Sequence, residues 1–173
     1  MRAFIGLGGN LTESASAFSR AVADLRGIGS VVKTSSLYVS APRDLFDQPD
    51  FSNAALELQT DLRPEVLLVE LKRLELALGR DPQGLRFGPR LVDLDILAID
   101  GKCVTETDID LIVPHPRLQE RRFALEPLAE IQPDLQPWHG CADVRRDVTV
   151  ADLLPAVADQ EVMRTAGPEW ADR

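Results

Sequence analysis

The sequence predicts a domain of the α+β class, a ferredoxin-like α/β sandwich with an antiparallel sheet, helices packed on it, and long loops. The 173-residue chain is long enough to bury one hydrophobic core, and its 45% hydrophobic and 27% charged residues are typical of globular proteins. The expected elements follow in the order β, α, β, β, α, β, which favours a split βαβ plan over a doubly wound sheet. We expect one domain over 1–158 and a polar, frayed tail over 159–173.

The first elements are defined by short apolar runs and the turn residues between them. The apolar run 3–7 predicts a strand that the following glycine pair ends, and helical spacing of apolar residues predicts a helix over 13–27. The stretch 30–40 is rich in β-branched residues and alternates, which predicts a strand. Two prolines and four acidic or amide residues then predict an irregular loop over 41–50.

The next elements are a strand, a helix and a glycine-rich loop. The stretch 51–60 alternates weakly, which predicts a strand. Pro64 occupies the place of a first helical residue, and leucines at intervals of three or four residues mark one face of a helix that Gly79 ends. Three glycines, two prolines and three arginines predict a mobile loop over 79–90.

The last part of the pattern contains one clear strand and several short elements. A strand is expected over 91–98, with a further strand near 102–113. A Pro-His-Pro turn opens the stretch 113–135, which predicts one or two short helices. The stretch 149–158 predicts one or two final helical turns.

The composition excludes several classes of partner. A net charge of −9 argues against nucleic acid and anionic membrane surfaces, and no segment has the apolar length needed to cross a bilayer. The N-terminus lacks the pattern of a secretory signal, so we expect a cytoplasmic protein, with a monomer as one option. Cys103 and Cys141 show no metal-binding spacing and are expected to be free thiols in a reducing compartment.

Two aspartates within the strand 91–98 are the chemical anomaly of the sequence. Because side chains alternate along a strand, Asp93 and Asp95 share one face with Leu91 and Leu97. Two carboxylates roughly 6 to 7 Å apart at the backbone repel each other unless cations neutralise them. Oxygen ligands favour Mg²⁺, which usually implies a phosphate ligand as well. The other face, assigned to the core, carries Val92, Leu94, Ile96 and Ala98.

Other readings of these charged residues stay open from the pattern alone. An isolated Asp-x-Asp is more often a solvated edge strand, and any one arginine is more often a solvated surface charge. The glycines of "GLGGN" fit neither a dinucleotide-binding nor a Walker phosphate loop, so a tight turn between strand and helix is preferred. Two basic clusters near the aspartates together favour a polyphosphate: Arg80, Arg86 and Arg90, and His115, Arg117, Arg121 and Arg122.

The run Gly88–Leu97, "GPRLVDLDIL", resembles the signature of the 6-hydroxymethyl-7,8-dihydropterin pyrophosphokinase family of folate biosynthesis. The resemblance continues, in the family's order, through "FIGLGGNL", "SSLYVSAP", "DQPDFSNAAL", "LELALGR", "VPHPRLQERRF" and "LEPLAEIQPDL". It covers roughly residues 3–135 with compatible spacing. It implies a ferredoxin-like fold with long active-site loops and transfer of pyrophosphate from ATP to the pterin hydroxymethyl group, with ATP and the pterin as the partners.

The resemblance also implies roles for individual residues. Asp93 and Asp95 would hold two Mg²⁺ ions and, with Arg80 and Arg90, form the catalytic group. ATP would contact Glu75, Arg80, Arg90, His115 and Arg121. The pterin would lie between the rings of Phe51 and Phe123, with Asn53 at its edge and the backbone of Ser40, Ala41, Pro42 and Arg43 beside it.

The chain departs from the family pattern at five positions, and two alternatives to the enzyme remain. A non-catalytic pterin- or nucleotide-binding protein of the same fold would release no product. Another Mg²⁺-dependent phosphotransferase, such as a nucleotidyltransferase, would release pyrophosphate instead of AMP. The departures are Phe87 for a common Trp, Phe51 for Tyr, Gly9 for Ser, Arg122 for Gly, and Pro82 for a frequent arginine.

Overall fold

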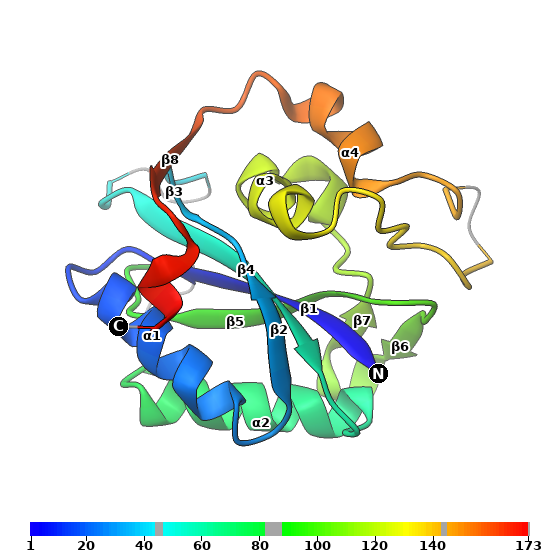
Figure 1. Ribbon diagram of the computed structural model, residues 1–173, viewed down its shortest axis with the longest axis horizontal. Helices are drawn as coiled ribbons and strands as arrows, with labels where there is room; N and C mark the ends of the chain where they lie inside the picture. Colours follow the sequence, from blue (N-terminus) through cyan, green and yellow to red (C-terminus); the bar gives the residue numbers. More distant parts are fainter. Residues whose placement is uncertain (44–46, 82–87, 143–144, 173) are drawn as a thin grey trace.

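The computed structural model describes residues 1–43, 47–81, 88–142 and 145–172. Its centre is a six-stranded antiparallel sheet in the order β5-β1-β4-β3-β8, with β2 paired to β4 (Figure 1). This arrangement confirms the predicted α+β sandwich with an antiparallel sheet. The strands are β1 (Arg2–Gly9), β2 (Ser30–Thr34), β3 (Leu37–Ser40), β4 (Phe51–Gln59), β5 (Asp93–Ile99) and β8 (Val162–Ala166).

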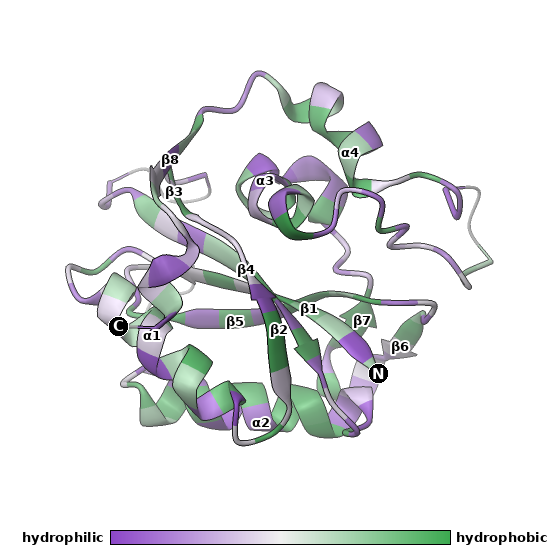
Figure 2. Ribbon diagram, in the orientation of Figure 1, coloured by the Kyte–Doolittle hydropathy of each residue, from purple (hydrophilic) through white to green (hydrophobic). Residues whose placement is uncertain are grey.

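Helices cover both faces of the sheet, α1 and α2 on one side and α3 and α4 on the other (Figure 1). The helices carry hydrophobic and hydrophilic residues along their length, as amphipathic elements at a surface do (Figure 2). Their bounds are α1 (Ser14–Leu25), α2 (Pro64–Ala77), α3 (Arg122–Ile131) and α4 (Val150–Leu153). The 3₁₀ segments of the described residues are η1 (Thr107–Ile109), η2 (Leu118–Glu120), η3 (Leu154–Val157) and η4 (Pro168–Asp172).

Two hydrophobic cores result from this layering. The α1–α2 side of the sheet, which we call the first core, buries Ile5, Leu7, Phe18, Val22, Leu56, Leu67 and Leu94. The α3 side, the second core, buries Phe4, Ala55, Leu97, Leu118, Leu125 and Leu128.

A shift in the pairing of β5 with β1 divides β5 into two halves. Phe4 pairs with Ala98 while Ile5 pairs with Ile96, so Leu97 is an extra residue in the ladder. Before the shift, Leu94 and Ile96 enter the first core, as predicted. After it, Ala98 lies in the second core, so the prediction that Ala98 shares their face is wrong.

Three predicted elements have different bounds. Strand β1 continues through Gly9, so the glycines placed in a tight turn belong to the sheet. The strand expected over 30–40 is two strands, because Ser36 at the break donates its backbone N–H and its hydroxyl to the carboxylate of Glu130 on α3. The further strand near 102–113 is a separate two-stranded sheet of β6 (Val104–Glu106) and β7 (Leu111–Val113).

The C-terminal tail is folded over residues 162–172, so the prediction that it is frayed is wrong there. Strand β8 pairs antiparallel with β3 and widens the sheet. Trp170 follows it, 3% exposed, and donates its indole N–H to Ser35 O at 2.8 Å. Its ring also packs edge-on against Phe18, with centroids 6.1 Å apart. One aromatic anchor thus fixes a segment whose composition is otherwise polar.

The two cysteines also differ from the prediction. Cys103 and Cys141 form a disulfide across a sequence separation of 38 residues, with Cα atoms 5.4 Å apart. Free thiols were expected because the sequence spacing does not show that the β5–β6 turn approaches the loop after Trp138. Among the described residues, no helix combines the length and apolar character needed to cross a membrane.

Candidate active site

A cavity of about 890 Å³ opens on the α3 side of the sheet, where β5, β1 and β4 meet the end of α2. Gly6 and Gly8 of β1 form part of its lining, and a Cβ at Gly8 would project to 3.9 Å from Asn53 Oδ1. Gly8 pairs with Asp93 on one side and with Asn53 on the other. The glycines therefore leave space between a carboxylate and an amide that lie in one row across the sheet.

Asp93, the first residue of β5, lies between two arginines. Arg80 Nη1 is 2.8 Å from Asp93 Oδ1, and Arg90 Nε contacts Oδ2. At Asp93 Oδ1 and Arg90 Nε, which are both buried, these ion pairs do not have the geometry of a hydrogen bond within the described part of the chain. Burial raises the pKa of Asp93 above its ordinary value, Arg90 and Arg80 lower it in part, and Asp95 raises it further. The two arginines therefore offset only part of the cost of burying the charged carboxylate of Asp93.

Asp95 shares the cavity with Asp93, as the strand alternation predicted. Its side chain is 47% exposed, and its Oδ1 lies 4.0 Å from Lys72 Nζ of α2. No group of three or more His, Cys, Asp and Glu side chains is placed to hold a metal ion within the described ranges. A pair of carboxylates on one face of β5 fits Mg²⁺, which prefers oxygen ligands and commonly takes the others from phosphate and water.

Glu75 lines the cavity, but its carboxylate is already occupied by protein donors. Its side chain is 1% exposed and accepts hydrogen bonds from Leu94 N at 2.7 Å, from Lys72 Nζ at 2.8 Å and from Arg80. Strand β5 is at the edge of the sheet, so the Leu94 N–H would otherwise have no acceptor. This geometry supports a scaffold role for Glu75, and the expected contact with ATP stays a prediction.

His115 and Arg121 form a donor pair that also lines the cavity. Burial lowers the pKa of His115, Asp95 opposes this, and Arg121 and Arg117 lower the pKa further. The ring is therefore neutral near pH 7, and its Nδ1 accepts from Arg117 N at 3.1 Å. The proton is accordingly assigned to Nε2, which lies 3.5 Å from Arg121 Nη1. Both groups can donate hydrogen bonds to an anion in the cavity.

The residues expected to bind a pterin gather at the other end of the cavity. Asn53 donates from Nδ2 to Ser40 Oγ at 3.0 Å and to Phe51 O at 3.1 Å, which fixes the orientation of its amide. The Arg90 guanidinium lies 4.8 Å from the centroid of Phe51. Two lining aromatic rings and a fixed amide suit a flat, hydrogen-bonding heterocycle. The lining at this end comprises Ser40, Ala41, Arg43, Gln48, Phe51, Asn53 and Phe123.

Not every predicted residue can be placed in this lining. Pro42 does not line the cavity, although its neighbours on both sides do. Arg86, Phe87 and Pro82 lie outside the described residues.

The sequence reasoning missed Asn10, which joins the two loops beside the cavity. Its Oδ1 accepts from Arg90 N at 2.8 Å, and its Nδ2 donates to Gln48 Oε1 at 2.9 Å and to Pro49 O at 3.2 Å. In the sequence, an asparagine after a glycine pair indicates only a turn. The partners of Asn10 lie 38 to 80 positions away, so no local pattern predicts its contacts.

Gly9, which stands where the family commonly has serine, has no room for a side chain. A Cβ at Gly9 would lie 2.3 Å from the backbone oxygen of Leu91 and 2.7 Å from Ser14 Oγ. The family's usual serine would require the backbone to move here. The close approach holds the end of β1 against the segment that leads into β5.

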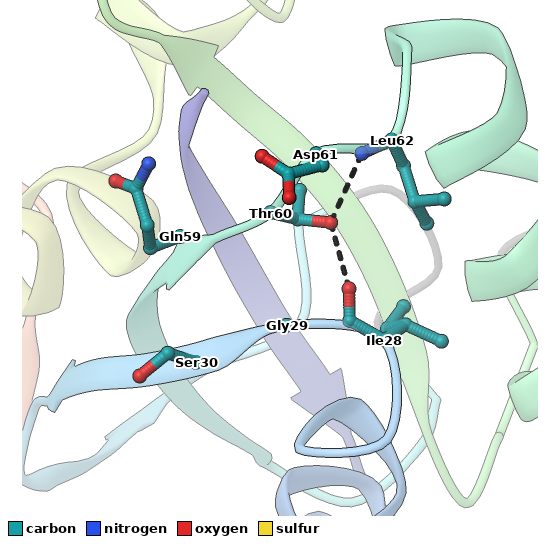
Figure 3. A pocket seen from close by; sticks show the side chains of 7 residues that line it. All are labelled: Ile28, Gly29, Ser30, Gln59, Thr60, Asp61 and Leu62. Atoms are coloured by element: carbon teal, nitrogen blue, oxygen red, sulfur yellow. Dashed lines mark hydrogen bonds between the residues drawn. The ribbon is translucent and has the colours of Figure 1, made fainter.

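A second hollow, of about 330 Å³, lies at the opposite end of β1 (Figure 3). There Thr60 Oγ1 donates to Ile28 O at 2.7 Å and accepts from Leu62 N at 3.2 Å. Among the described residues that line it, Asp61 is the only ionisable one. These contacts close a turn and give the hollow no constellation for chemistry.

The chain matches the model of the 7,8-dihydro-6-hydroxymethylpterin-pyrophosphokinase family over residues 4–133. It belongs to this family. The match spans β1 through α3 and so includes the cavity residues described above.

Similar proteins include one of similar length and others that are much longer than this chain. A 2-amino-4-hydroxy-6-hydroxymethyldihydropteridine pyrophosphokinase of Bacillus subtilis is 40% identical over 164 residues, which cover 94% of this chain and 88% of that protein. The folic acid synthesis protein fol1 of Pneumocystis carinii is 43% identical over 162 residues, 92% of this chain but only 20% of the relative's length. A crystal structure of Plasmodium falciparum HPPK-DHPS with pteroate has a TM-score of 0.68 at 14% identity, covering 91% of this chain and 42% of that one. The last likeness concerns the fold alone.

Proposed function

We propose that this member of the pyrophosphokinase family transfers a pyrophosphoryl group from ATP to 6-hydroxymethyl-7,8-dihydropterin. The products are AMP and the pterin pyrophosphate. The proposal combines the family membership with one geometric observation in the cavity.

That observation is the row Asp93, Gly8 and Asn53 across β5, β1 and β4. Neighbouring strands are about 4.8 Å apart, so the carboxylate and the amide are anchored roughly 10 Å apart. The absence of a side chain at Gly8 keeps the space between them open. One cavity therefore has a charged end suited to phosphates and an amide-aromatic end suited to a pterin.

The charged end can bind and orient a polyphosphate. Arg80 and Arg90 lie beside the carboxylates, and His115 and Arg121 present further N–H groups in the same cavity. Such donors offset charge on phosphate oxygens and fix the direction of the transferred group. Mg²⁺ held by the two aspartates, which we propose as two ions, would supply further charge neutralisation.

The pterin end can place the attacking hydroxymethyl oxygen in line with the phosphates. Asn53 is held by Ser40, so it offers its amide with little loss of side-chain entropy on binding. Phe51 and Phe123 can exclude water from the faces of the heterocycle. Positioning of two substrates in one cavity supplies a large part of the rate in reactions of this type.

The test is to incubate the protein with Mg²⁺, ATP and the hydroxymethyl pterin and to resolve nucleotides and pterins by chromatography. AMP formed in step with pyrophosphorylated pterin is the expected result. Pyrophosphate instead of AMP would support a nucleotidyltransferase, and saturable binding without either product would support a binding protein.

A matched pair of variants separates the site from general surface charge. Asp95→Ala removes a carboxylate that is 47% exposed in the cavity, and Asp100→Ala removes one that is 44% exposed just after β5. Asp100 pairs with Arg2 at the far end of the strand. We expect loss of AMP formation for Asp95→Ala alone.

A further inference from the structure

The short segment 158–160 contacts both sides of the pterin end of the cavity, although it lies beyond the residues that match the family model. It connects η3 to β8 and passes beside the start of α3. Its central contact is made by the side chain of Gln160.

The Gln160 amide uses both its oxygen and its nitrogen. Oε1 accepts from Arg43 Nη1 at 3.1 Å and from Arg122 N at 3.0 Å. Nε2 donates to Glu120 O at 2.9 Å, and Arg43 Nη1 also donates to that carbonyl. One side chain therefore joins the loop after β3 to the turn between η2 and α3.

Arg122 attaches the same segment from the other side. Its Nη1 donates to Ala158 O at 3.1 Å and to Gln160 O at 3.0 Å, while its Nε pairs with Glu126 at 2.8 Å, one turn along α3. The family commonly has glycine at this position, and glycine could make none of these side-chain contacts. The substitution of arginine for the family's glycine thus supplies the contacts that anchor the segment 158–160.

The two elements that Gln160 joins each carry cavity residues. Arg43 lines the cavity from the loop after β3, and Phe123, the residue after Arg122, lines it from α3. We propose that Gln160 is a positioning residue for the pterin, which sets the separation between Arg43 and Phe123. This inference rests on the proposed function, because it assigns the pterin to this end of the cavity.

The physical reason is preorganisation. Arg43 is exposed and sits in an irregular loop, so without a fixed partner it would lose side-chain and loop entropy when a ligand binds. A network that already holds it removes part of that cost before binding. The effect should therefore appear in the affinity for the pterin and leave the phosphate end unchanged.

The test compares three variants in steady-state kinetics. Gln160→Met keeps the length of the side chain and removes all its hydrogen bonds, while Gln160→Glu keeps an acceptor for Arg43 and for the Arg122 N–H. Gln136→Met is the matched control, because Gln136 is also half-buried but, among the described residues, its side chain donates only to Asp147 O at 3.4 Å.

We expect Gln160→Met to raise KM for the pterin about five- to tenfold, as loss of hydrogen bonds to a charged group does. Its kcat and its KM for ATP should stay within about twofold of the wild type, because these contacts do not reach the phosphates. Gln160→Glu should recover part of the loss, and Gln136→Met should match the wild type.

Hydrogen exchange at the Arg122 amide reports the network independently of turnover. Faster exchange in Gln160→Met with an unchanged KM for the pterin would overturn the proposal, because the network would then be structural only. If the wild type forms no AMP, the proposed function fails, and direct pterin titration of the same variants still decides the role of Gln160. If Gln160→Met does not fold, Arg122→Ala, which releases the segment without touching the cavity, replaces it under the same criteria.

Discussion

The buried carboxylate of Glu75 gives the sharpest prediction about stability. Glu75→Ala leaves the Leu94 N–H at the free edge of β5 without an acceptor and removes the counter-charge of Lys72 and Arg80. Glu75→Gln keeps a side-chain oxygen that can still accept from Leu94. The two variants therefore separate the hydrogen bond to the strand from the ion pairs.

The structure sets the expected magnitudes. An unsatisfied buried N–H costs about 1–3 kcal/mol. Lys72 is 44% exposed and Arg80 is 34% exposed, so each ion pair is screened by solvent and contributes about 0–1 kcal/mol. We expect Glu75→Ala to lower the free energy of unfolding by about 2–4 kcal/mol and Glu75→Gln by about 1 kcal/mol.

Urea unfolding without ligands measures both values, provided that the dependence on urea concentration is unchanged. Glu70→Ala is the control on the same helix, because Glu70 forms a partly exposed i,i+3 pair with Arg73 at 2.8 Å, and its loss should cost less than about 0.5 kcal/mol. Equal destabilisation by Glu75→Ala and Glu75→Gln would refute the reasoning, since the strand hydrogen bond would then contribute nothing.

Three further results are expected. Asp95→Ala should abolish AMP formation and leave the circular dichroism spectrum unchanged, because it removes a cavity carboxylate that is not in the core; near wild-type turnover would contradict the site. Because folding lowers the pKa of His115, its imidazole binds a proton more readily in the unfolded chain than in the folded one. The neutral imidazole's contribution to stability is therefore present above about pH 6.5 and is lost as the pH falls through the folded-state pKa. His115→Gln should reduce the fall in the urea midpoint between about pH 7.5 and about pH 5.5, and an unchanged fall would exclude this residue as its source. Reduction of the Cys103–Cys141 disulfide, which spans a sequence separation of 38, should lower the free energy of unfolding by roughly 4 kcal/mol. Urea unfolding with and without reductant measures this change, and equal midpoints would show that the disulfide does not constrain the unfolded chain.

The fold was predictable where local periodicity and the buried face agree. Helix α2 and the strands before and after it, β4 and β5, follow directly from apolar spacing. The break between β2 and β3 was not predictable, because it depends on Glu130, which is 94 positions from Ser36. The ordered tail was missed for the same reason: one buried Trp170 outweighs the polar residues around it.

The site shows the same division between local and distant signals. Asp93 and Asp95 stood out because charged residues are anomalous within an apolar strand. Asn10 and Gln160 did not stand out, because each acts through hydrogen bonds to segments that are remote in sequence. Glu75 was assigned as a contact for ATP, yet its role in satisfying an edge strand follows only from the three-dimensional position of β5.

The bulge at Leu97 explains how one strand can serve both a polar cavity and two cores. Up to Ile96 the pleat of β5 is regular, so the aspartates face the cavity while Leu94 and Ile96 face the first core. The extra residue then puts Leu97 and Ala98 together in the second core, beneath α3. The polar half of the strand therefore ends where α3 begins to cover the sheet, and the cavity is bounded by a change of register as well as by the loops around it.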